Sequence, residues 1–241
     1  QTTYYLDDDN DGYGNADETK LACSAPSGYV TVNADCDDSD AHTHPSAYEY
    51  CNGVDNDCDG VEVSSGVGLT LDGGTSWSDK SSYFSTTAGV QSGGYSDEGD
   101  WFFCGNTTYF VNWEINDDIT VTGVNGIPML DGGGVDSVID IDSHTLSLTN
   151  IQINNGYSAG NGGGIHQVAG VLNLVDVTFL YNDAEGSGGA IYLASNARMY
   201  ADNIYLFLNT ANELGGGIYT WGGEVEIHDS QFYYNLAQSY G

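Results

Sequence analysis

Residues 162–182, GGGIHQVAGVLNLVDVTFLYN, decide the fold, because the chain repeats this pattern along residues 138–241. The pattern occurs four times at a spacing of 26 or 27 residues, with one extra residue in the third unit. Apolar residues within a unit lie two positions apart, which is the period of a β-strand. Equivalent apolar positions align in four columns: Ile139/Ile165/Ile191/Ile218, Leu146/Leu172/Met199/Val225, Leu148/Leu174/Ala201/Ile227 and Ile153/Phe179/Leu206/Phe232.

Stacking of the units explains these columns. If each repeat climbs one coil, equivalent residues lie about 4.8 Å apart, and a column becomes a continuous dry core. Glycines precede the first column, where the chain must turn tightly or take positive φ. An asparagine follows the fourth column by three residues, at Asn182, Asn209 and Asn235, and stacked amides can hydrogen-bond between coils. The sequence predicts an all-β chain with regular solenoid coils over residues 138–241.

The GG[A/G]I and FxxN marks of these units resemble the polymorphic outer-membrane-protein repeats of bacterial surface proteins. The resemblance covers roughly residues 138–241 and implies a right-handed parallel β-helix. The first unit departs from it, with Gly156 in place of the asparagine.

Composition indicates a chain that works outside the cell. Thirty-five acidic residues face three basic ones, Lys20, Lys80 and Arg198, for a net charge of −32. Such a chain repels nucleic acid and anionic membrane surfaces, so metals are its natural counter-ions. No apolar run is long enough to cross a bilayer, and Gln1 in place of Met suggests a processed end. We expect a secreted, extracellular or cell-surface bacterial protein.

The sequence predicts that residues 1–62 form a separate acidic module. Its first motif, from Asp7 to Glu18, fits the calcium-loop pattern D-x-D-x-D-G-x5-E at every specified position. A hard cation such as Ca²⁺ takes about six to eight oxygens. The loop offers carboxylates, one backbone carbonyl and one amide oxygen, from Asp7, Asp9, Asp11, Tyr13, Asn15 and Glu18.

Two further loops follow in the same module. A loop of the same length, without the central Gly, offers Asp38, Asp40, His42, His44 and Glu49. A third loop starts with Asp55, Asp57 and Asp59, but no acid closes it. We expect this half-loop to borrow a ligand, with Asp35 and Asp37 as the first candidates and Glu62 as a further donor. Asp35 and Asp37 could instead complete the second site or bridge to a neighbour.

The run from Tyr5 to Gly60 resembles the metal-binding repeat of secreted bacterial proteins that is named for a methanotroph surface copper protein. The matching residues are DNDGYG at 9–14, DCDDSD at 35–40, Pro45, Glu49, Cys51 and GVDNDCDG at 53–60. The family name implies copper, whereas hard oxygen ligands favour calcium. We expect roughly two or three structural Ca²⁺ ions. A copper or zinc site built from His42, His44 and an aspartate is the alternative.

Four cysteines, Cys23, Cys36, Cys51 and Cys58, form an even set in this small module, where disulfides often hold a fold. Three pairings are open, and the local pairs Cys23–Cys36 and Cys51–Cys58 are favoured. The gaps between them lack the close paired spacing of zinc modules. Cys104 is left over, either buried near Trp101 or paired outside the chain.

For residues 63–137, the sequence predicts irregular early coils and a cap for the N-terminal end of the solenoid. Short strand-like runs, among them WFF at 101–103 and WEI at 113–115, alternate with Gly, Ser and Asp turns, and a loop is expected around residues 76–99. A cap is needed because an open coil end recruits other strands. Asn106 begins the sequon Asn106-Thr107-Thr108, a candidate glycosylation site.

The alternative function is a carbohydrate-active enzyme, because polysaccharide lyases and hydrolases share the β-helix fold. A calcium-assisted lyase needs a strong base beside clustered acids, and Arg198 has no column of acids around it. A hydrolase needs paired carboxylates; Glu224 and Glu226 share an outer face but are more simply solvated. An outward column of His166, Tyr192 and Tyr219 is either a sugar-stacking strip or lateral packing. We favour a protein without catalytic activity.

The sequence thus predicts an exported structural or cell-surface protein, in which metal binding folds the module ahead of the solenoid. No closing segment follows the last coil, so we expect either that the natural protein continues beyond Gly241 or that another subunit covers the open coil. Head-to-tail self-association through the solenoid ends, giving extracellular filaments, is therefore one expectation. A monomeric adhesin for surface glycans or for host or community surfaces is the other. We expect no nucleic-acid partner and no membrane span.

Overall fold

The structure is a computed structural model that describes residues 1–60, 62, 66–70, 77–87 and 98–239. The chain divides into a first unit, Gln1–Val63, and a second unit, Ser64–Gly241, which we describe separately. In the described residues the regular elements are strands, apart from one 3₁₀ turn, η1 (Ser81–Tyr83). These residues contain no helix with the length and apolar character needed to cross a membrane.

The first unit contains one small antiparallel sheet. Strand β1 (Thr2–Leu6) lies between β2 (Asn15–Ala22) and β3 (Tyr29–Val30). Among the unit's described residues, the buried hydrophobic side chains are Tyr4 and Cys51. Apolar burial contributes about 1.5–3 kcal/mol per large side chain, so this unit depends on stabilisation of another kind.

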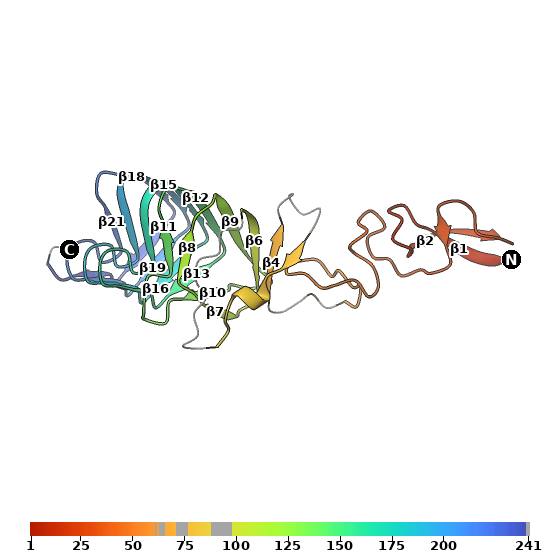
Figure 1. Cartoon of the computed structure of the whole chain (residues 1–241), viewed down its shortest axis with the longest axis horizontal. Coiled ribbons are helices and arrows are strands. Elements are labelled where there is room, and N and C mark those ends of the chain that lie inside the picture. Colours follow the sequence, from red (N-terminus) through yellow and green to blue (C-terminus); the bar gives the residue numbers. More distant parts are fainter. Residues whose placement is uncertain (61, 63–65, 71–76, 88–97, 240–241) are drawn as a thin grey trace. The chain divides into compact units, whose positions relative to one another are not determined.

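The second unit is a parallel β-solenoid, as the repeat predicts (Figure 1). One sheet stacks six parallel strands, one above the other: β7 (Thr108–Phe110), β10 (Met129–Asp131), β13 (Gln152–Asn154), β16 (Thr178–Leu180), β19 (Tyr205–Phe207) and β23 (Gln231–Tyr233). A short third sheet stacks β14 (Tyr157–Ser158), β17 (Asp183–Ala184), β20 (Thr210–Ala211) and β24 (Leu236–Ala237).

The largest sheet carries most of the core. Its parallel strands are β6 (Gly99–Cys104), β8 (Trp113–Ile115), β9 (Ile119–Val124), β11 (Ile139–Ile141), β12 (Thr145–Thr149), β15 (Ile165–Val175), β18 (Ile191–Asp202), β21 (Ile218–Thr220) and β22 (Glu224–His228). Strand β4 (Val67–Thr70) pairs antiparallel with β6 and with β5 (Ser78–Asp79), so it covers the first coil. Of the loop expected around residues 76–99, residues 76 and 88–97 lie outside the described part of the chain.

The strand register confirms all four predicted columns. Ile139 pairs with Ile165, Ile165 with Ile191, and Ile191 with Ile218, and the other three columns stack in the same way. The extra residue of the third unit appears as a register shift in the β15–β18 pair, between Gln167 and Ala169. One β-bulge therefore absorbs the irregularity and leaves the core columns in step.

The columns continue upstream of the regular repeats. Trp113 stacks on Ile139, and Tyr109 stacks on Leu130. Edge-to-face contacts join Phe84 to Trp101, Phe103 and Trp113, with ring centres 4.9–5.7 Å apart. The early coils thus use the same stacking geometry as the later ones, with aromatic rings filling positions that aliphatic side chains occupy later.

A ladder of asparagines runs along one corner of the solenoid, and its first two members, Asn182 and Asn209, are fully buried. Asn182 donates from its backbone and side-chain nitrogens to Asn209 Oδ1, at 3.0 and 2.9 Å. Asn209 donates in the same way to Asn235 Oδ1, at 3.1 and 2.8 Å. The ladder ends at Gly156, whose N–H donates to Asn182 Oδ1. A Cβ at Gly156 would lie 1.9 Å from the Gly163 carbonyl oxygen, so the first unit has no room for the asparagine.

Two phenylalanines of one core column provide a matched pair for measuring what coil stacking contributes. Phe179 is fully buried, whereas Phe232 in the last coil is 46% exposed. We expect Phe179→Ala to lower the free energy of unfolding of the solenoid by about 3–5 kcal/mol. We expect Phe232→Ala to lower it by less than about 1 kcal/mol in the monomeric chain. Urea unfolding of both variants measures the difference, and equal losses would contradict the stacked core.

Candidate metal centre

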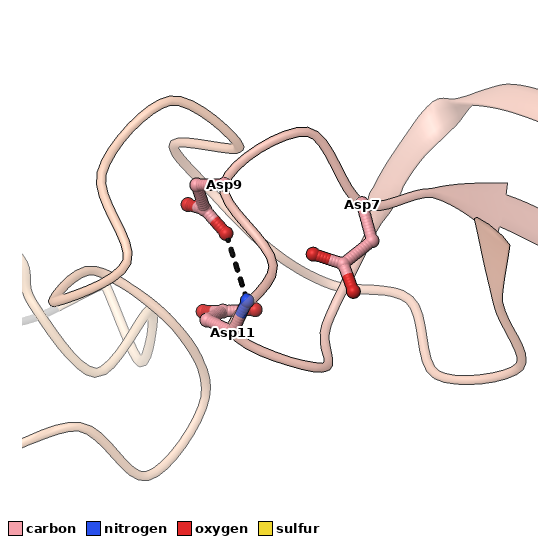
Figure 2. Close-up of side chains that lie close together, drawn as sticks. All are labelled: Asp7, Asp9 and Asp11. Atoms are coloured by element: carbon pink, nitrogen blue, oxygen red, sulfur yellow. Dashed lines mark hydrogen bonds between the residues drawn. The ribbon is translucent and has the colours of Figure 1, made fainter. Parts of the chain in front are cut away.

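The loop between β1 and β2 gathers three carboxylates. Asp7, Asp9 and Asp11 lie on this loop, and each places an oxygen within 4.8 Å of the other two (Figure 2). The turn is held by local bonds, because Asp11 N donates to Asp9 Oδ1 at 3.1 Å and Tyr13 N donates to Asp11 Oδ1 at 2.7 Å. Gly12 has a φ of +98°, which a residue with a Cβ rarely adopts. Asp7 is only 9% exposed.

A second group brings a distant segment to the same loop. Asp9, Asp35 and Asp38 again place one oxygen each within 4.8 Å of the others. Two contacts hold the segment in place: an isolated parallel bridge between Asn15 and Asp35, and a bond of 3.2 Å from Asp8 N to Asp38 Oδ1. Asp9 therefore belongs to both groups.

A third group lies further along the first unit. It consists of Glu49, Asp55 and Asp57. Asp57 N donates to Glu49 Oε1 at 2.7 Å, and Gly60 N donates to Asp55 Oδ2 at 2.8 Å. The acid that meets the third loop is therefore Glu49, whereas Asp35 and Asp37 were the expected donors. Asp35 instead joins Asp9.

The oxygens of these groups are ready to bind a cation. Among the described residues, the buried carboxylate oxygens without a hydrogen-bond partner are Asp7 Oδ1, Asp9 Oδ2, Asp11 Oδ2, Asp35 Oδ2 and Glu49 Oε2. All five belong to the three groups. A buried charge without a partner is costly unless a counter-charge lies beside it. Lys20 is the only Lys or Arg of the unit, and its amine lies 4.1 Å from the centre of the Tyr29 ring.

The donor set and its dimensions fit a hard divalent cation. Two ligands of one Ca²⁺ ion can lie up to about 5 Å apart, because each Ca–O distance is about 2.3–2.6 Å. The limit of 4.8 Å within each group satisfies this condition. Every member of the three groups is an aspartate or glutamate, and such oxygen donors suit Ca²⁺, Mg²⁺ or Mn²⁺ better than copper.

Crowding of the carboxylates affects their protonation. Burial raises the pKa of Asp9, Asp35 and Asp38 above the ordinary value, and the neighbouring Asp11 carboxylate raises each pKa further. Backbone N–H donors act in the opposite direction but do not cancel these effects. In the absence of a cation, the folded unit therefore binds protons more tightly than the unfolded chain does.

We expect acid to stabilise the metal-free first unit. Between the ordinary pKa of 3.8 and the raised values, the folded state carries more protons, so its stability falls as pH rises. The folded fraction of the first unit in protein stripped of metal and desalted, measured by circular dichroism, should therefore rise as the pH is lowered from neutral towards the ordinary pKa of 3.8. Calcium-loaded protein should show the opposite slope, because protons compete with the cation for the same oxygens. A metal-free protein that loses stability on acidification would contradict this prediction.

Several expected ligands of the first loop lie outside the groups. Glu18 is exposed on strand β2, and Asn15 Oδ1 accepts the N–H of Asp17 at 2.9 Å. The calcium-loop pattern assumes a helix after the loop, which returns its last Glu to the ion. Here an extended strand follows and rises about 3.3 Å per residue, which carries Glu18 away. Asp35 and Asp38 reach the loop instead.

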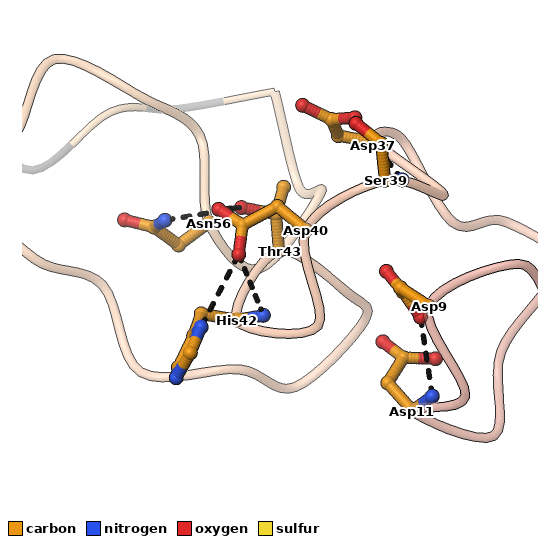
Figure 3. A network of polar contacts seen from close by, with 8 residues as sticks. All are labelled: Asp9, Asp11, Asp37, Ser39, Asp40, His42, Thr43 and Asn56. Atoms are coloured by element: carbon orange, nitrogen blue, oxygen red, sulfur yellow. Dashed lines mark hydrogen bonds and ion pairs between the residues drawn. The ribbon is translucent and has the colours of Figure 1, made fainter. Parts of the chain in front are cut away.

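The second expected loop forms a polar network (Figure 3). Asp40 Oδ1 accepts the backbone N–H of His42 and lies 3.2 Å from its ring Nδ1. His44 stacks on Tyr13, with ring centres 4.9 Å apart. Neither histidine belongs to a metal-competent group of the described residues. Asp37, Asp40 and Asp59 also lie outside the three groups, and Asp37 Oδ1 accepts the Ser39 hydroxyl at 2.6 Å.

Sequence reasoning missed the buried residue at the centre of this network. Asn56 is 1% exposed, and its side-chain amide donates to Thr43 Oγ1 at 3.3 Å and accepts from Tyr50 N at 3.2 Å. The backbone carbonyl oxygen of Asn56 accepts the N–H of His44 at 2.9 Å. Asn56 therefore connects the second loop to the third. The available signal was an asparagine between two aspartates of a loop motif, where a short amide favours local turns.

The cysteines correct the expected pairing. Cys36 pairs with Cys58, and Cys23 is free and exposed. The favoured pairs Cys23–Cys36 and Cys51–Cys58 are therefore wrong. Cys104 is fully buried, and it is disulfide-bonded. The spacing of the cysteines in the sequence could not identify the correct pairing, because the fold brings Cys58 back to Cys36 across the second loop.

Breaking the Cys36–Cys58 bond should destabilise the first unit. The bond closes a loop with a sequence separation of 22, for which chain entropy gives about 3 kcal/mol. We expect the double variant Cys36→Ser/Cys58→Ser to lose roughly this amount, measured by unfolding under calcium-saturating conditions. Cys23→Ser is the matched control and should leave stability unchanged. An equal loss in the control would contradict the observed pairing.

The candidate catalytic and modified residues of the solenoid lie on its outer surface. Arg198 Nε lies 3.1 Å from Glu224 Oε2, and His228 Nε2 lies 2.8 Å from Glu226 Oε1; all four side chains are more than half exposed. His166, Tyr192 and Tyr219 stack on one another, with centres 5.4 and 5.8 Å apart. Asn106 is exposed, and its Oδ1 accepts Ile127 N at 3.0 Å.

Two family models match parts of the chain. Residues 35–62 match the Cu-binding MopE model, described as a putative metal-binding motif. Residues 176–194 match the Chlamydia polymorphic membrane protein repeat. No curated protein and no solved structure matches the chain. The matches agree with the two resemblances read from the sequence, and the Asp7–Asp11 loop lies outside both.

Proposed function

We propose that this chain is an exported, calcium-stabilised structural protein of a cell surface. The metal-binding motif, the surface-protein repeat and the β-solenoid are consistent with a structural or surface role. The observation that carries the calcium part is the set of five buried carboxylate oxygens without hydrogen-bond partners. They lie in a unit whose buried hydrophobic side chains, among the described residues, are Tyr4 and Cys51.

Calcium has the best support among the metals. The three groups contain no nitrogen or sulfur ligand, and copper and zinc bind those ligands preferentially. Magnesium demands compact octahedral geometry, whereas calcium accepts irregular sets of carboxylates.

The test compares metals on the whole chain. Isothermal titration of metal-free protein with Ca²⁺, Mg²⁺, Cu²⁺ and Zn²⁺ should give the tightest binding for Ca²⁺. Glu49→Gln should remove one calcium ion, whereas Asp17→Asn, an exposed residue outside the groups, should remove none. Tighter binding of Cu²⁺ than of Ca²⁺, with loss of the copper in a His42→Ala/His44→Ala variant, would overturn the calcium proposal.

A role without catalysis is part of the proposal. Arg198 is neutralised by Glu224, and Glu226 is engaged by His228. A catalytic acid and a catalytic base need different pKa values, which enclosed surroundings provide. Exposed carboxylates of this kind lack such surroundings. Incubation with acidic polysaccharides should release no reducing ends or unsaturated products. Detection of either product, and its loss in Glu224→Gln, would establish the enzyme instead.

Self-association through the last coil is the second part of the proposal. Val225 and Phe232 belong to core columns but are 37% and 46% exposed, whereas their counterparts in the preceding coil are buried. Among the described residues, strands β21, β23 and β24 lie at sheet edges, and such edges pair readily with other strands. Negative-stain microscopy of this chain should show rods that Phe232→Lys disperses. Monodisperse particles of wild-type protein would favour a monomeric adhesin.

A further inference from the structure

The feature that leads beyond a set of separate calcium sites is the position of Asp9. Asp9 is a member of the group with Asp7 and Asp11 and of the group with Asp35 and Asp38. These five carboxylates come from two segments that lie more than twenty residues apart in the sequence. They form one continuous cluster, because both groups share a single side chain.

The backbone fixes the two segments against each other. The parallel bridge between Asn15 and Asp35 joins the start of β2 to the distant segment, and Asp8 N donates to Asp38 Oδ1 at 3.2 Å. On the loop side, Asp11 N donates to Asp9 Oδ1 at 3.1 Å. Asp9 is thus oriented by its own loop while it faces the acids of the other segment.

Unpartnered oxygens lie on both sides of Asp9. Asp7 is nine-tenths buried, and its Oδ1 has no hydrogen-bond partner. Asp11 Oδ2 on the loop and Asp35 Oδ2 on the other segment are also buried without a partner, as is Asp9 Oδ2 between them. Each half of the cluster therefore offers its own buried oxygen to a ligand, in addition to the oxygens of Asp9.

Charge balance indicates how many cations this cluster takes. Two like charges about 4 Å apart repel by about 4 kcal/mol near a protein surface. One divalent cation would offset two of the five carboxylate charges, whereas two cations would offset four. Paired metal ions that share a ligand commonly lie about 3.5–4 Å apart. That separation is compatible with one carboxylate reaching both ions.

We infer that Asp9 bridges two calcium ions, one held with Asp7 and Asp11 and the other with Asp35 and Asp38. The inference rests on the proposed calcium-binding function and assigns the stoichiometry and the shared ligand of its main site. The pair of ions ties the β1–β2 loop to the segment around residues 35–38. The group of Glu49, Asp55 and Asp57 remains a separate site for a single ion.

Native mass spectrometry of the calcium-loaded full chain tests the bridge. Asp9→Asn should lower the number of bound Ca²⁺ ions by two, whereas Asp7→Asn and Asp38→Asn should each lower it by one. Asp17→Asn is the matched control and should change nothing. Glu49→Gln identifies the ion that is bound by the Glu49 group, because this variant should lose that ion alone. If Asp9→Asn keeps the same ion, the part of the first unit around Glu49 is still folded in that variant. Loss of the same number of ions in Asp9→Asn and Asp7→Asn would overturn the bridge.

A spectroscopic measurement reports the pairing directly. Mn²⁺ takes oxygen ligands and can replace Ca²⁺ as a paramagnetic probe. Mn²⁺-loaded wild-type protein should give the electron paramagnetic resonance spectrum of a spin-coupled pair, which Asp9→Asn should abolish. Spectra of isolated Mn²⁺ ions alone would overturn the bridge and leave calcium stabilisation intact. Wild-type protein that binds no divalent cation at all would overturn the proposed function together with the bridge.

Discussion

Removal of calcium is expected to unfold residues 1–60 and to leave the solenoid folded. One site that is saturated at 100 times its Kd contributes about 2.7 kcal/mol, so three sites contribute about 8 kcal/mol. That sum is comparable with the whole stability of a typical domain, about 5–15 kcal/mol. Apart from its disulfide-bonded cysteines, the first unit has little else to replace it, since its described buried hydrophobic side chains are Tyr4 and Cys51.

Hydrogen exchange of the whole chain, with and without a calcium chelator, measures this effect by segment. Amides of β1 and β2 should lose most of their protection, whereas those of β15 and β18 should keep it and serve as the internal control. Re-addition of Ca²⁺ should restore protection, and Mg²⁺ at the same concentration should restore much less. Equal protection of residues 1–60 in both conditions would refute a structural role for the cation.

Asn209→Ala is expected to be among the most destabilising single substitutions in the solenoid. Asn209 is fully buried; its Oδ1 accepts two bonds from Asn182, and its Nδ2 donates to Phe179 O at 3.0 Å and to Asn235 Oδ1. Each buried polar group left without a partner costs about 1–3 kcal/mol. Asn209→Ala removes the partners of several buried groups at once, namely the two nitrogen donors of Asn182 and the carbonyl oxygen of Phe179. We therefore expect a loss of about 3–6 kcal/mol in the free energy of unfolding.

Asn173→Ala is the matched control for this substitution. Asn173 lies on the same solenoid but is half-buried, and its side chain donates to Ser147 Oγ at 3.0 Å. Its loss should stay below about 1 kcal/mol, because water can replace the missing bond. Urea unfolding of both variants gives the comparison, and similar losses would show that the ladder contributes no more than a surface hydrogen bond.

The regular coils could be predicted from sequence because the same kind of side chain returns at the same spacing. Ile165 and Ile191 identify each other in the sequence, and the structure stacks them. The earlier coils lacked this signal. Trp113 occupies the place of an isoleucine, and the steps from Tyr109 to Leu130 and from Leu130 to Ile153 are shorter than the later repeat. Stacking tolerates these changes because the strands, not the turns, set the register.

The candidate metal site could be predicted only in part, because some of its residues lie on one turn whereas others reach it through tertiary contacts. Asp7, Asp9 and Asp11 alternate on one turn, so a sequence motif was sufficient to group them. Asp35 and Asp38 reach Asp9 only through the bridge at Asn15, which is a tertiary contact. Glu18 matched the motif, but the motif does not encode whether a helix or a strand follows. The partner of Cys36 likewise depended on how the second loop returns.

The asparagine ladder also bears on how a chain of this kind can change in length. The internal ladder residues Asn182 and Asn209 each bond to the coils on either side, and none of the ladder bonds reaches further than an adjacent coil. Energetic terms in such a structure act between nearest neighbours, so each internal coil adds a similar increment of stability. Duplication or deletion of one 26- or 27-residue segment would therefore preserve every contact type. The length of the solenoid is a variable that evolution can adjust in whole coils, independently of the acidic unit that precedes it.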